Sequence, residues 1–101
     1  MALNTTRYDT ADYLDSPEAI AAYIDAVFED GDPALITHAL GVVARARGMS
    51  QIAREAGLSR ESLYRALDSD GNPEFGTVVR VLKALGLRLM AVPMDAPSRA
   101  S

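Results

Sequence analysis

The chain has 101 residues and a mass of 10.8 kDa, and 49% of its residues are apolar, which is enough for one small domain with a buried core. It has no cysteine and one histidine, which excludes disulfides, thiolate or two-histidine metal sites and cysteine nucleophiles. No apolar run approaches the roughly 20 residues of a membrane span and no signal peptide is evident, so we expect a cytoplasmic protein.

The net charge of −4 is unevenly distributed along the chain. Residues 1–33 hold eight acids against Arg7, a net charge of −7. Residues 45–65 hold five arginines against two glutamates, a net charge of +3. This separation predicts two surfaces with different partners, one of them nucleic acid. The alternative is that the acids merely solvate the first helices.

Start and stop signals predict five helices. Ser16-Pro17-Glu18 and Asp32-Pro33 are typical helix beginnings, with a capping side chain followed by proline at the first helical position. Ser50 and Ser59 are predicted to cap two short helices, and glycines end most of the five. The expected ranges are about 17–30, 33–47, 51–56, 60–67 and 75–85.

We divide the chain, as one domain, into four functional parts. They are an acidic N-terminal arm over residues 1–15, a helix pair over 50–67, a dimerisation strand over 87–92, and a frayed tail over 94–101.

The helix pair over residues 50–67 is the most informative segment, because only Gly57-Leu58-Ser59 joins its two helices. Such a turn sets the helices at about 90–120° to each other, and glycine suits the sharp reversal of the backbone. Ala53 allows close approach of the second helix, and Leu63 supplies a buried anchor. The pattern predicts a helix-turn-helix whose second helix enters the major groove of DNA.

The polar side chains of this pair are the candidate DNA-binding residues. Arginine donates two parallel hydrogen bonds to a guanine edge or single bonds to phosphates, and short neutral donors orient a protein on the DNA backbone. The helix N-termini present further N–H groups to phosphates. The candidates are Gln51, Arg54, Ser59, Arg60, Glu61, Ser62, Tyr64 and Arg65, with Arg47 beside them.

Several of these residues have a structural alternative. Glu61 and Arg65 are spaced to pair along their own helix, which would contribute about 0.3–0.5 kcal/mol. Tyr64 could instead pack on the core, whereas Arg60 has no such acidic neighbour and is the stronger candidate. His38 lies beside an apolar stripe, where we expect a packed or exposed side chain rather than a catalytic one.

Residues 87–92 are too few for another helix and are typical of a strand, which Pro93 ends. A lone strand with an open edge is unfavourable, and a second copy across a two-fold axis would pair it. We therefore expect a homodimer joined through Leu87, Leu89 and Ala91. Two recognition helices would then lie about 34 Å apart, in successive major grooves of a palindromic operator.

Over residues 8–89 the chain resembles the antidote (antitoxin) proteins of addiction modules, in the HigA-like helix-turn-helix group. The run around Arg47-Gly48-Met49 and the helix after the glycine turn are the most specific parts. The tail after Pro93 carries no signal. The matching segments are Tyr8-Asp9, Asp12-Tyr13-Leu14, Pro17-Glu18, Ala22-Tyr23, Gly31-Asp32-Pro33, Ala44-Arg45-Ala46-Arg47-Gly48-Met49, Gly57-Leu58-Ser59-Arg60-Glu61-Ser62-Leu63-Tyr64, Gly71-Asn72-Pro73-Glu74-Phe75 and Ala84-Leu85-Gly86-Leu87.

The resemblance implies an all-α, five-helix, lambda-repressor-like fold with a short C-terminal strand, in a dimer. It also implies a small basic toxin of the RelE or HigB superfamily, typically a ribonuclease acting on translated mRNA and encoded by the adjacent gene. By this analogy the protein neutralises the toxin and represses the operon that encodes both. The acidic front of the chain suits such a partner, and we expect toxin contacts at Tyr8, Asp12, Tyr13 and Leu14.

Two rival functions are open. An orphan prophage-type regulator would share the helix-turn-helix but lack a toxin, and gene neighbourhood separates these two. A protein-interaction module would use its acidic face and not bind DNA. We expect neither an enzyme nor a cofactor or metal, because the sequence has no nucleophile beside a base, no metal-ligand spacing and no phosphate-binding glycine loop.

Overall fold

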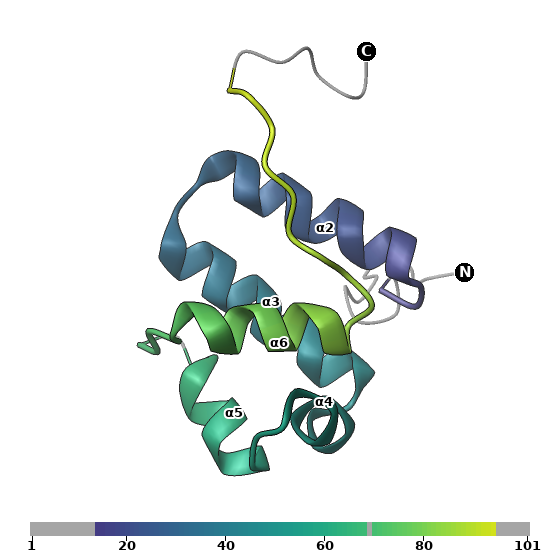
Figure 1. The fold of residues 1–101 in the computed structure, drawn as a ribbon, viewed down its shortest axis with the longest axis vertical. Coiled ribbons are helices and arrows are strands. Elements are labelled where there is room, and N and C mark those ends of the chain that lie inside the picture. The colour runs from purple at the N-terminus through teal and green to yellow at the C-terminus, as the bar shows by residue number, and fades with distance from the viewer. Residues whose placement is uncertain (1–13, 69, 95–101) are drawn as a thin grey trace, which may run out of the picture.

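The computed structural model describes residues 14–68 and 70–94. Over these ranges the chain forms five helices: α2 (Pro17–Asp30), α3 (Pro33–Arg47), α4 (Met49–Ala56), α5 (Arg60–Ala66) and α6 (Phe75–Ala84) (Figure 1). The expected helical architecture is therefore confirmed for the described part of the chain. Only residues 14 and 15 of the predicted arm, and residue 94 of the predicted tail, are described.

Three of the helices begin behind the side-chain caps that the sequence predicts. In each, a side-chain oxygen accepts a hydrogen bond from a backbone N–H that the first turn leaves without a helical partner. The bonds are Ala19 N–H to Ser16 Oγ at 3.1 Å, Ala34 N–H to Asp32 Oδ1 at 2.9 Å, and Ser62 N–H to Ser59 Oγ at 3.0 Å.

The predicted cap at Ser50 is wrong. α4 begins at Met49, two residues before the predicted start at residue 51, and its N-terminus has no side-chain cap. Gly48 ends α3 and starts α4 by itself, with φ 108° and ψ 107°, and its N–H donates to the Ala44 carbonyl at 2.9 Å. Because one glycine redirects the chain between the two helices, Ser50 falls inside α4, on its exposed side.

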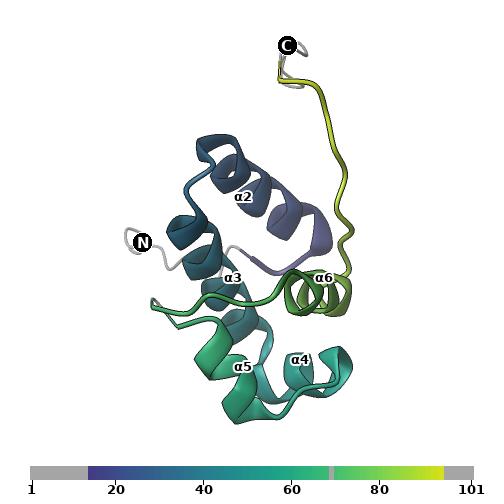
Figure 2. The ribbon, with the colours of Figure 1, turned by 60° about the vertical axis from the view of Figure 1, so that its left-hand side comes forward.

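One hydrophobic core joins all five helices. α6 packs mainly on α4, and α2 packs on α3. Figures 1 and 2 show α2 at one end of the molecule, α4 and α5 at the other, and α3 and α6 between them. The acidic helix and the basic helix pair are therefore held at opposite ends. The largest fully buried side chains are Leu14, Ile20, Leu40, Val43, Leu63, Val81 and Leu82.

The segment after α6, residues 87–94, does not contain the predicted strand in the described structure. The Leu87 N–H donates to the Leu82 carbonyl at 2.8 Å, but residues 88–94 make no backbone hydrogen bond to the described part of the chain. A strand requires a neighbouring strand, and a single copy of the chain offers none here. The segment instead leaves α6 and runs past α2 (Figures 1 and 2). Strand pairing with a second copy stays a prediction.

Candidate nucleic-acid interface

The connection between α4 and α5 is fixed by Gly57, which lies in the left-handed region with φ 75° and ψ 30°. Glycine adopts this conformation without the steric cost that a Cβ atom brings. Its N–H donates to the Arg54 carbonyl at 3.2 Å, and the Leu58 N–H donates to the Ala53 carbonyl at 2.8 Å. These two bonds form a Schellman motif, which sets the direction in which the chain enters α5.

The inner sides of α4 and α5 are anchored in the core. Leu58 is partly buried and packs against the same core as Leu63, as expected of a hydrophobic staple at the start of α5. At the end of α5, Leu67 is buried and Ala66 only partly so. The buried positions of the pair are Ile52, Ala53, Ala56, Leu63 and Leu67.

A small hydrogen-bond network orders the start of the exposed side of α5. Ser59 Oγ donates to Ser62 Oγ at 2.8 Å in addition to capping the helix. Arg65 Nη2 donates to the same Ser62 oxygen at 3.5 Å, so Arg65 is oriented by a hydroxyl rather than by Glu61. Since a guanidinium has five N–H donors, Arg65 keeps donors for a ligand.

Arg60 and Tyr64 form a second pair, one helical turn apart. Arg60 Nη2 donates to Tyr64 Oη at 3.3 Å, and the guanidinium carbon lies 5.3 Å from the centre of the tyrosine ring. This is a cation–π contact. Tyr64 is 40% exposed and so is not a core residue. The contact restricts both side chains, which reduces the entropy they lose when a ligand immobilises them.

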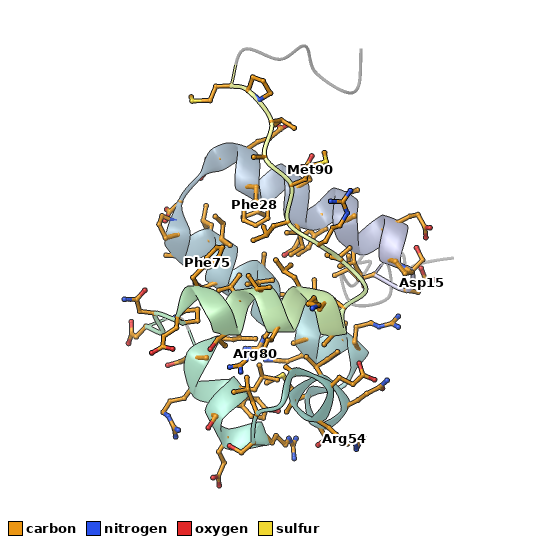
Figure 3. All side chains as sticks on the ribbon, in the orientation of Figure 1. Asp15, Phe28, Arg54, Phe75, Arg80 and Met90 are labelled. Carbon is orange, nitrogen blue, oxygen red and sulfur yellow. The ribbon has the colours of Figure 1, made fainter. Side chains whose placement is uncertain are left out.

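The candidates on α4 flank this surface. Gln51 Nε2 donates to Glu55 Oε2 at 3.3 Å, and Arg54 is exposed near the end of the helix (Figure 3). All eight predicted DNA-binding residues thus lie on α4 and α5 or at the cap of α5, where seven are exposed and Ser62 is half-buried.

The positions of two other arginines differ from what the sequence predicted. Arg47, expected beside the helix pair, directs Nη1 to the Asp15 carbonyl at 3.4 Å and so contacts the start of the described chain. Arg80 of α6, which sequence analysis missed, is exposed and extends toward the end that carries α4 and α5 (Figure 3). The available signal was a charge interrupting the apolar run Val78–Leu82.

The opposite end of the molecule is acidic. Residues 14–33 hold six exposed acids and no base. Of the residues expected to contact a toxin, Tyr8, Asp12 and Tyr13 lie outside the described residues. Leu14 is 1% exposed and packs in the core. The exposed acids are Asp15, Glu18, Asp25, Glu29, Asp30 and Asp32.

The residues expected to join a dimer differ in exposure. Leu87 is half-buried against the core, Leu89 is 38% exposed, and Ala91 is exposed. Met90 and Val92 between and beyond them are 71% and 55% exposed. This segment therefore presents apolar side chains to solvent along its whole length.

In residues 14–68 and 70–94, no group of three or more His, Asp or Glu side chains is placed to hold a metal ion. None of the helices described is long and apolar enough to cross a membrane.

Comparison with known proteins matches residues 4–93 to a family described as probable addiction module antidote proteins. An uncharacterized protein of Haemophilus influenzae is 52% identical over 81 residues, which cover 80% of this chain and 84% of that protein. No solved structure matches the chain. The antidote part of the sequence-based resemblance is therefore confirmed, whereas the HigA-like grouping and the lambda-repressor-like fold stay predictions.

Proposed function

Because this chain belongs to the family of probable addiction module antidote proteins, we propose that it is a sequence-specific DNA-binding antitoxin. The family implies the antitoxin of an addiction module, a non-enzymatic regulatory protein with a toxin partner. The proposal adds that the toxin is small, basic and of the RelE or HigB kind, and that the protein represses the operon encoding both.

The observation that carries the DNA-binding part is the exposed side of α5. Arg60, Tyr64 and Arg65 stand on a helix whose inner side is buried and whose start is fixed by the Ser59 cap. The surrounding residues 45–65 have a net charge of +3 in a chain of net −4. A rigid helix with ordered guanidinium groups suits the major groove, where arginine reads guanine edges.

The homodimer is the second added part. Residues 88–94 make no backbone–backbone hydrogen bond to the described chain, and a second copy could pair with their backbone donors and acceptors. Pairing through Leu87, Leu89 and Ala91 across a two-fold axis would set two α5 helices on a palindromic operator, about 34 Å apart. Removing residues 90–101 should then yield a monomer in light scattering, and a truncated protein that is still dimeric contradicts this interface.

The experiment that tests DNA reading is a mobility shift with a duplex from upstream of the gene, against random competitor duplex. If each subunit neutralises several phosphates, raising the salt concentration from about 50 to 200 mM should weaken binding by at least tenfold. The shift is repeated with the product of the adjacent gene present, since a toxin can act as a co-repressor. A folded protein that shows no specific binding in either condition contradicts the proposal.

Neutralisation of a toxin is tested separately, by expressing the adjacent gene with and without this protein. Arrested growth that this protein restores supports the antitoxin function. Growth that is unaffected by the adjacent gene favours the orphan regulator, in which only DNA binding is retained.

A further inference from the structure

An open apolar groove lies between α2 and the segment 87–94, at the end of the molecule remote from α5. Its volume is about 1510 Å³, whereas small-molecule pockets measure roughly 300–1,000 Å³. Phe28 of α2 and Met90 of the segment line it, and Figure 3 shows both. Met90 is 71% exposed and Met94 fully exposed. The groove is therefore large enough for a helix or strand of another protein.

The side of the groove formed by α2 is acidic. Among the residues that the structure describes, Asp25, Glu29 and Asp30 line it and Arg88 is the single base, which gives these four a net charge of −2. Glu29 and Asp30 also stand in the last turn of α2, where there is no basic residue. Negative charge at a helix C-terminus opposes the helix dipole, so the dipole itself does not favour acids at these positions. A basic ligand in the groove would turn the same charges into a favourable field.

The opposite side of the groove, residues 88–94, has open backbone groups as well as apolar side chains, because it makes no backbone hydrogen bond to the described chain. On the α2 side, Ala21, Ala22 and Ala26 line the groove with side chains no longer than a methyl group. An added element can therefore approach the α2 backbone closely while bonding along the segment.

Charge decides which occupant this groove suits. A second copy of the chain would bring an identical acidic surface, and like charges brought together oppose association. A basic amphipathic segment instead gains both from the apolar lining and from the acids. We propose that this groove is the docking site for such a segment of the toxin partner.

The inference rests on the proposed function for the identity of the partner as a toxin. It also places the toxin away from α5, because the groove is lined by α2, and α2 lies at the opposite end of the protein from the α4–α5 pair (Figure 2). DNA and toxin can then bind one subunit at the same time, with the dimer using the edge of residues 87–92 that faces away from α2.

The test is a fluorescence titration with two labelled peptides of about 18 residues, the length of a helix spanning roughly 27 Å. One has leucine and lysine at amphipathic helical spacing, and the other has glutamate in place of every lysine. They are titrated into the wild-type protein and two groove variants, Asp30→Lys and Met90→Asp. The matched controls are Glu18→Lys, which also replaces an acid by lysine, and Leu35→Asp, which also replaces an apolar residue by aspartate. Both lie at exposed positions outside the groove.

The basic peptide should bind in a salt-dependent way, and each groove variant should raise its Kd by about tenfold while the controls change it by less than about twofold. The adjacent gene product should displace the peptide. Equal losses in groove and control variants, or equal binding of the acidic peptide, would overturn the groove as a specific site. If the peptide does not bind and Met90→Asp converts a wild-type dimer to monomers, the occupant is a second copy and the proposal is wrong.

The displacement step separates this inference from the proposed function. If the adjacent gene product is a toxin that this protein neutralises but it leaves the peptide in place, the antitoxin function stands and the docking site is wrong. If the adjacent gene product does not bind the protein at all, the antitoxin function fails independently of the peptide result.

Discussion

The two ends of this protein are built on different principles. At the α4–α5 end, polar side chains stand on helices whose inner faces are buried and whose ends are closed by backbone hydrogen bonds. At the other end, Leu89, Met90 and Val92 are exposed, and residues 88–94 make no backbone–backbone hydrogen bond to the described chain. The first surface is complete in a single copy, which suits a ligand as regular as a DNA duplex. The second leaves apolar side chains exposed, and under our proposals another protein covers them.

The largest expected effect tests whether the stability of the protein depends on side chains of the α4–α5 end and not on those of residues 87–94. Leu63→Ala removes a side chain with no exposed surface and should lower the free energy of unfolding by about 2–5 kcal/mol. Leu89→Ala, the same change at a 38% exposed position, should lower it by less than about 1 kcal/mol. Urea denaturation at low protein concentration measures both. Similar losses of unfolding free energy in the two variants would mean that residues 87–94 pack on the protein in solution. The two ends would then not differ in burial.

The second prediction compares an arginine of the α4–α5 end with an arginine of the acidic end in their effects on DNA binding. Arg60→Ala should weaken binding to the specific duplex by about 1–3 kcal/mol, because an arginine that reads a base edge supplies that much discrimination. Arg88→Ala removes the same charge from the acidic end and should leave the affinity within a factor of about two. Mobility shifts with specific and random duplexes give both values. Equal effects on both duplexes would assign Arg60 to a phosphate, and no effect would remove it from the interface.

The third prediction concerns the turn that orients α5. Gly57→Ala has no atom to clash with, but it forces a Cβ into a left-handed conformation and should cost about 1–2 kcal/mol of stability. Gly76→Ala is the matched control: it lies inside α6 with open space around it and should stabilise the protein by about 0.5–1 kcal/mol. Thermal unfolding distinguishes the two. A Gly57→Ala variant that is as stable as the wild type or more so would show that the Gly57 backbone relaxes.

Much of this fold could be predicted from sequence because its signals are local. A capping side chain and the glycine that ends a helix act within a few residues, so the start of α2 at Ser16 and the turn at Gly57 were both predicted correctly. Seven of the eight candidate residues of the helix pair are exposed and Ser62 is half-buried, since burial of Leu63 and its neighbours dictates which sides of α4 and α5 remain outside. Their binding of DNA stays a prediction.

The features that sequence reasoning missed depend on contacts between distant segments. Phe75 fits the apolar spacing of its helix but is 72% exposed, because it is the first residue of α6 and extends beyond the core. Leu14 belongs to the core although it precedes the first described helix. Gly71 is needed for close approach: a Cβ there would overlap the Ala66 carbonyl and lie 2.8 Å from that of Arg65. None of these follows from spacing along the chain.

The smallest expected effect concerns the argument that the acids of α2 serve binding rather than folding. Asp30→Lys places a cation at the negative end of the α2 dipole and should stabilise the protein by about 0.3–1 kcal/mol at low salt. Glu18→Lys makes the same charge change at the positive end and should destabilise it by a similar amount. Both shifts should shrink in about 1 M salt, where the Debye length falls to about 3 Å.

The charge reversals Asp30→Lys and Glu18→Lys distinguish an effect on stability from an effect on binding. Asp30→Lys should give a more stable protein that binds a basic partner less well. Urea denaturation and peptide titration on the same samples measure both quantities. If Asp30→Lys instead destabilises the protein, Asp30 contributes to the fold, and its position at the groove no longer argues for a basic ligand. A gain in stability combined with a loss of binding would support the view that Asp30 serves binding at a cost to the stability of its own helix.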